Sequence, residues 1–191
     1  MVVIGAAEAL TAAALMFLGV SFFVLGMVLL GRGGLKDAGP IFFASGGITA
    51  ILALILLIFA MNGFFIGTLS STAAGPLVTV AFVLLVFAST WLVAGTVAMK
   101  GYDTVPLGSL GIFFGITMIP VAVFLWGNPL GFGQYWLTMN TILWIWVFFT
   151  LPLAFMFKVI SGKVAGWSFL AEALITLWIP ATLILLGIKL P

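Results

Sequence analysis

Residues Trp167 to Ala181 read Trp-Ser-Phe-Leu-Ala-Glu-Ala-Leu-Ile-Thr-Leu-Trp-Ile-Pro-Ala, an apolar run with one carboxylate, Glu172, near its middle. A charge at the centre of a bilayer costs at least about 2.5–3.5 kcal/mol, so we expect Glu172 to face protein or water rather than lipid. Thr176 follows one helical turn later, on the same face. Pro180 lacks the N–H that would bond the Thr176 carbonyl, so we expect that oxygen to be free. The run therefore predicts a spanning helix with one polar strip, which is the first candidate site.

The composition of the whole chain agrees with a membrane setting. Of 191 residues, 65% are hydrophobic and only 5% are charged, and the mean hydropathy is +1.45. Soluble domains carry about 25% charged residues because their surface meets water. The composition therefore predicts an all-α membrane protein whose surface meets lipid. Its few, scattered charges do not form a nucleic-acid footprint, so we expect no nucleic-acid partner.

The absence of two residue types excludes several kinds of chemistry. Without cysteine the chain has no disulfide, thiolate or Cys-based metal site, and without histidine it has no His-held haem or zinc, Ser-His nucleophile or His proton relay. Gly108-Ser109-Leu110-Gly111 has no histidine to activate its serine, and no Gly-rich phosphate loop occurs. Asn128-Pro129 stands alone, whereas a water channel of the familiar type needs two Asn-Pro-Ala loops. We expect no enzyme activity, no cofactor and no metal site.

Six runs are long and apolar enough to cross a membrane, which takes about 20 residues each. We place them, within one domain of residues 1–191, near residues 9–30, 40–61, 76–99, 107–126, 135–157 and 167–188. The two halves of the chain show weak sequence similarity. Leu18-Gly19-Val20 resembles Leu110-Gly111-Ile112, and the segment Thr90 to Ala94 resembles Leu177 to Ala181. This similarity favours two inverted repeats of three helices each, although matches in so apolar a sequence also arise by chance.

The connections predict the orientation. Three on one side carry basic residues: Gly31–Gly39, Lys100–Thr104 and Lys158–Gly166. The two on the other side, Asn62–Gly75 and Gly127–Gln134, carry no charge. The positive-inside rule puts the basic connections in the cytoplasm and both termini outside, with Lys189 as the exception.

Two aromatic pairs with a spacing of four residues are further candidates. Phe87 pairs with Trp91 in the third run, and Trp144 pairs with Phe148 in the fifth. Pro152 frees the Phe148 carbonyl as Pro180 frees that of Thr176. Ordinary packing is an alternative for both pairs, just as a protonated or hydrogen-bonded structural carboxyl is an alternative for Glu172.

The sequence resembles the AmiS/UreI family of urea channels and short-chain amide transporters. The clearest match is Ser161-Gly162-Lys163 followed by Trp167, Glu172 and the segment Leu177 to Ala181. Further positions fit at family spacing: Gly46-Gly47, Phe87, Thr90-Trp91-Leu92, Asp103, Pro106, Pro120 and Trp144.

The resemblance implies a six-helix protomer with its own pore, assembled as a ring of six. It implies a pore lined by an aromatic pair on the third helix, two aromatics on the fifth, the glutamate on the sixth and a constriction on the first. These positions fall on Phe87, Trp91, Trp144, Phe148, Glu172, Leu18 and Phe22. Trp91 stands where the family has Tyr and Phe148 where it has Trp, so the slot can differ in shape and in preferred solute.

Together these observations favour a passive channel for urea or short-chain amides in a bacterial inner membrane, with a functional link to a cytoplasmic urease or amidase. Flat neutral amides suit a slot between aromatic faces, and their N–H groups can donate to Glu172 or to the carbonyls of Thr176 and Phe148. Without histidine we expect no steep acid gate. The alternatives are a proton-coupled transporter using Glu172 and a structural membrane subunit without a pore.

Overall fold

The computed structural model describes residues 5–127 and 134–188, which form a bundle of six apolar helices, each long enough to cross a membrane. The first four are α1 (Ala6–Leu29), α2 (Leu35–Phe65), α3 (Ser71–Lys100) and α4 (Val105–Gly127). The fifth is α5 (Gln134–Leu151), which continues into a π-helical segment, Pro152–Met156. The sixth consists of α6 (Gly162–Glu172), a π-helical segment (Ala173–Trp178) and α7 (Ile179–Leu185). The all-α class and the six spans predicted from the sequence are confirmed, and the chain is a multi-pass membrane protein.

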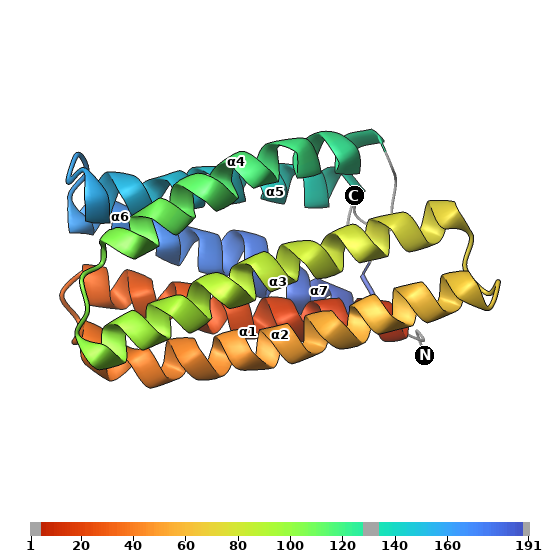
Figure 1. Cartoon of the computed structure of the whole chain (residues 1–191), viewed down its shortest axis with the longest axis horizontal. Coiled ribbons are helices and arrows are strands. Elements are labelled where there is room, and N and C mark those ends of the chain that lie inside the picture. The colour runs from red at the N-terminus through yellow and green to blue at the C-terminus, as the bar shows by residue number, and fades with distance from the viewer. Residues whose placement is uncertain (1–4, 128–133, 189–191) are drawn as a thin grey trace.

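Neighbouring helices run in opposite directions, and three connections meet at one end of the bundle, on the left in Figure 1. This is the basic end. Within residues 5–127 and 134–188 it holds every Lys and Arg: Arg32, Lys36, Lys100, Lys158 and Lys163. The predicted Asn128-Pro129 feature and Lys189 lie outside the described residues.

The described helices begin earlier than the predicted runs. The α2 and α3 helices start at Leu35 and Ser71, five residues before Pro40 and Pro76, where the prediction began them. Each proline removes a single hydrogen bond close to the helix end, where the affected carbonyl can be solvated. The sixth helix starts at Gly162 because the Ser161 hydroxyl caps it, accepting a hydrogen bond from the Val164 N–H at 3.3 Å. Predicted connections containing Lys36 and Lys163 are therefore partly helical.

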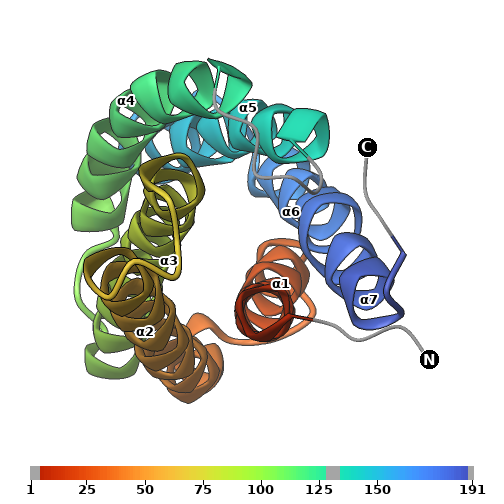
Figure 2. The same cartoon turned by 90° about the vertical axis from the view of Figure 1, so that its right-hand side faces the viewer.

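The packing places α1 between two groups of helices. Seen along the bundle (Figure 2), α2 and α3 lie on one side, α6 and α7 on the other, and α4 with α5 joins them. The α1 helix packs against both α2 and the sixth helix, while α2 packs on α3 and α4 on α5.

Small residues allow the closest approaches between helices, as their spacing indicates. Gly26 and Gly166 bring the backbones of α1 and α6 together. Gly19 leaves room for the indole of Trp178, which also stacks on Phe23 and donates to the Met16 carbonyl at 3.1 Å. This arrangement fixes the sixth helix, and with it Glu172, against α1.

Candidate functional site

A cluster of aromatic rings fills the middle of the bundle. Phe22 of α1 contacts Phe87 and Trp91 of α3, with ring centroids 5.7 and 5.2 Å apart. Phe87 in turn contacts Trp144 edge to face at 5.1 Å and Phe148 at 4.8 Å, both on α5. The two aromatic pairs predicted from their spacing, on α3 and α5, are therefore brought together, and Phe22 of α1 joins them. All five rings are buried.

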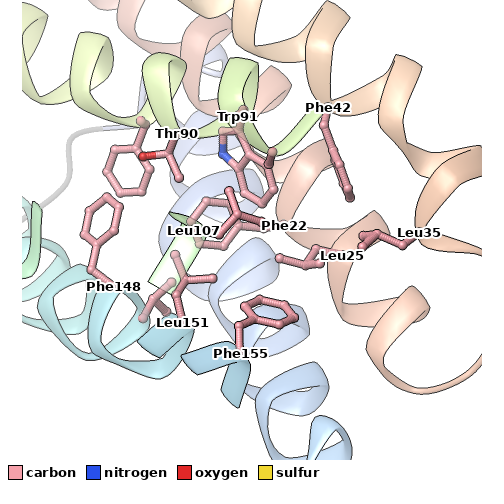
Figure 3. Close-up of a pocket in the computed structure, with 13 residues that line it drawn as sticks. Phe22, Leu25, Leu35, Phe42, Thr90, Trp91, Leu107, Phe148, Leu151 and Phe155 are labelled. Carbon is pink, nitrogen blue, oxygen red and sulfur yellow. The ribbon is translucent and has the colours of Figure 1, made fainter. Parts of the chain in front are cut away.

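A cavity lies on the basic-end side of this cluster (Figure 3). We call it the basic-end cavity. Its walls are almost entirely aromatic and aliphatic: Phe22, Leu25, Leu35, Phe42, Phe87, Thr90, Trp91, Ala94, Leu107, Val147, Phe148, Leu151 and Phe155. Its volume is about 20 Å³, room for about one water molecule.

A second cavity, the far-end cavity, lies on the other side of the cluster. It is lined by Thr11, Leu15, Val80, Val83, Leu84, Leu125, Leu137 and Trp144, and its volume is about 10 Å³. Leu18, which is fully buried, lies on α1 between Leu15 of the far-end cavity and Phe22 of the basic-end cavity. The two cavities and the rings between them form a narrow line along the bundle, and a solute larger than water passes only if side chains move.

The sixth helix presents a polar strip to α5. The Trp144 indole N–H donates to the Thr176 hydroxyl at 3.1 Å, and that hydroxyl donates to the Glu172 carbonyl at 2.9 Å. Both Glu172 and Thr176 are buried, as expected for a strip that avoids lipid. The π-helical segment Ala173–Trp178 carries Thr176 and follows Glu172 directly. Glu172 is not among the residues that line either cavity.

The expectation that the Thr176 carbonyl is free is wrong. The side-chain amide of Asn140 on α5 donates to it at 3.1 Å. Sequence reasoning missed Asn140, although a buried amide in an apolar run, one turn before Trp144, is a usable signal. A chain that leaves a carbonyl without a helical partner needs another donor, because an unsatisfied group in a membrane interior is costly.

The Phe148 carbonyl lies at the interface between α4 and α5. It lies against Gly111 of α4, so close that a side chain at Gly111 would collide with it. Pro152 packs on the same glycine. The absence of a side chain at Gly111 therefore allows α4 and α5 to approach closely at this carbonyl.

Two buried polar atoms of the predicted site residues have no protein partner in the part of the chain that is described: Glu172 Oε2 and Trp91 Nε1. One is an acceptor and the other a donor. Trp91 also lines the basic-end cavity, beside Thr90 (Figure 3). Buried polar groups are normally satisfied, so each of these atoms has unused capacity for a hydrogen bond.

Trp126 is exposed near the end of α4, as expected for an interfacial aromatic. Among the described residues, no group of three or more His, Asp or Glu side chains could hold a metal ion.

The fold and site thus define a six-helix membrane protein with an aromatic constriction between two small cavities. The chain matches the AmiS/UreI family transporter model over residues 10–188, and it belongs to that family. The resemblance read from the sequence is therefore confirmed.

Solved structures share the fold. A structure of the Helicobacter pylori urea channel in its closed state aligns with a TM-score of 0.78 and 19% identity, covering 92% of this chain and 97% of that one. A crystal structure of the urea channel from the same human gastric pathogen aligns with a TM-score of 0.76 and 19% identity, covering 93% and 98%. A search of curated proteins gave no match.

Proposed function

We propose that this chain is a passive channel for urea or short-chain aliphatic amides. The observation that carries the proposal is the aromatic constriction between the two cavities, where Trp91 has an indole N–H without a protein partner among the described residues. Glu172, buried on the sixth helix, has one carboxylate oxygen without such a partner. An amide has a flat shape, a carbonyl that accepts and N–H groups that donate. Trp91 Nε1–H can donate to the carbonyl and Glu172 can accept from the N–H groups.

The proposed pore set is Leu18, Phe22, Phe87, Trp91, Trp144, Phe148, Thr176 and Glu172. Its members are buried. The apolar slot offers few hydrogen bonds, which keeps binding weak enough for release. Family membership and the urea-channel fold support the same solute class.

The setting we propose is a bacterial inner membrane, with the basic end in the cytoplasm, both termini outside and a working link to a urease or amidase. The gathering of the described Lys and Arg residues at one end supports this orientation. We also propose two inverted three-helix repeats and a homo-hexamer. Native mass spectrometry tests the hexamer directly, because it should find six chains of 20.2 kDa each.

A second candidate is a proton-coupled amide transporter. The partnerless Glu172 Oε2 in the bundle interior favours it, since buried carboxyl groups serve as proton carriers in many transporters.

Stopped-flow swelling of proteoliposomes tests the solute class. We expect fast uptake of urea and acetamide and slow uptake of glycerol, which is not planar, without any pH gradient. Urea and acetamide uptake no faster than in empty liposomes would contradict the proposal.

A further inference from the structure

Asn140 links the fifth helix to the polar strip of the sixth. Its side chain is buried in α5, with 3% of its surface exposed, and its amide donates to the Thr176 carbonyl at 3.1 Å. Pro180 has no N–H to offer this carbonyl, so the bond from α5 replaces a missing bond of the sixth helix.

The hydrogen bond from Asn140 fixes Thr176, and Thr176 in turn accepts a hydrogen bond from the indole of Trp144. Thr176 is fully buried, and its hydroxyl accepts from Trp144 Nε1 at 3.1 Å while donating to the Glu172 carbonyl at 2.9 Å. Trp144 lies edge-on to Phe87 and lines the far-end cavity. A displacement of Thr176 therefore moves the acceptor that fixes the indole at the constriction.

We propose that Asn140 is a positioning residue of the solute slot, acting through Thr176 on the orientation of Trp144. The proposal rests on the channel function proposed above. Asn140 is not among the residues that line either cavity, so its action is indirect. Without its amide, the buried Thr176 carbonyl loses the donor that α5 supplies to it. The π-helical segment then shifts or takes up water, and the slot loses its fixed width.

Asn140→Leu tests this, because leucine has a similar size and cannot donate. Thr141→Val is the matched control: Thr141 is also buried on α5, but its hydroxyl bonds back to the Leu137 carbonyl of its own helix, at 2.8 Å, and to no other helix among the described residues. We expect the ratio of urea to glycerol permeability to fall by roughly threefold to tenfold in Asn140→Leu, the effect of one lost hydrogen bond. The control should keep the ratio of the unmodified protein.

A spectroscopic readout does not depend on conduction. With isotope-labelled tryptophan, the indole N–H resonance of Trp144, assigned through Trp144→Phe, should shift in Asn140→Leu and stay in place in Thr141→Val. An unshifted resonance would overturn the inference, even if urea does not permeate. If Asn140→Leu fails to fold, Asn140→Ala, which also removes the amide donor to the Thr176 carbonyl, should shift the resonance and lower the ratio. An unchanged resonance in that variant would equally overturn the inference.

The two proposals fail in different ways. If the unmodified protein conducts no urea, the channel function is wrong, and the resonance alone decides the role of Asn140. If it conducts and Asn140→Leu keeps its selectivity, only the inference is wrong.

Discussion

At the scale of single residues, two buried polar atoms of the proposed pore set have no protein partner among the described residues. Glu172 Oε2 can only accept while it is ionised, and Trp91 Nε1 can only donate. A urea or acetamide molecule has both complementary groups on one rigid plane. Under the proposed channel function, we expect these two atoms to favour an amide over an alcohol of the same size.

Glu172→Gln should lower urea permeability by roughly fivefold to tenfold. The substitution keeps an oxygen acceptor and removes the charge, and hydrogen bonds to charged groups are stronger by about 1–1.5 kcal/mol. Stopped-flow swelling measures the effect. Glu8→Gln is the control, since Glu8 lies at the start of α1 and, within the described residues, accepts a hydrogen bond from the exposed Gly5 N–H at 3.0 Å. Equal permeability of both variants and the unmodified protein would remove Glu172 from the proposed pore.

Trp91→Phe should lower amide permeability by roughly twofold to fivefold, because the solute loses the indole N–H, a donor with no protein partner among the described residues. The smaller ring also leaves a void in the buried aromatic cluster, so thermal stability in detergent should fall as well. Trp178→Phe is the contrasting variant for stability, because the Trp178 N–H donates to the Met16 carbonyl and its loss adds about 0.6–1 kcal/mol for the hydrogen bond. Amide permeability of Trp91→Phe equal to that of the unmodified protein would contradict this assignment.

Much of the site could be predicted from the sequence at this scale, and the failures have a physical cause. A carboxylate or aromatic pair in an apolar run marks a buried position because lipid excludes it. The missing N–H of Pro180 shows that the Thr176 carbonyl lacks a helical partner, but not which side chain replaces it. That depends on the packing of α5 against the sixth helix, which brings Asn140 to it.

At the scale of helices, close backbone contacts set the shape of the slot. Gly111 of α4 lies directly against the Phe148 carbonyl and Pro152, at the place where α5 turns into a π-helical segment. Phe148 lines the basic-end cavity. The α4 helix therefore supports the residue that forms one wall of the constriction.

Gly111→Ala should destabilise the protein by about 1–3 kcal/mol, because the added methyl collides with backbone that cannot rotate away. Thermal unfolding in detergent measures it. Gly47→Ala adds the same methyl to α2 where nothing lies within 4 Å, so it should change stability by less than about 0.5 kcal/mol. Equal stability of the two variants would contradict the proposed contact.

The helix count could be read from the sequence, while helix ends could not. Apolar length predicts a span because lipid demands it over about 20 residues. Pro40 and Pro76 suggested helix starts, yet both helices begin five residues earlier. Near a helix end, solvation of the carbonyl offsets the loss of one hydrogen bond. A proline in the first turns therefore does not reliably mark the residue at which a helix begins.

At the scale of the whole molecule, the chain lacks any imidazole, the side chain that titrates between pH 5 and 7. Urea permeability should therefore show no steep change between pH 5 and pH 7. Swelling rates measured at both values should exceed those of empty liposomes. A channel closed at pH 7 and open at pH 5 would contradict this prediction.

The central claim is that amides cross this protein passively, and tracer uptake tests it most directly. Labelled urea is followed into proteoliposomes with and without an imposed pH gradient, beside empty liposomes. The account predicts uptake faster than in empty liposomes, ending at the external concentration whether or not the gradient is present. Accumulation above the external concentration with the gradient, or uptake no faster than in empty liposomes, would contradict it.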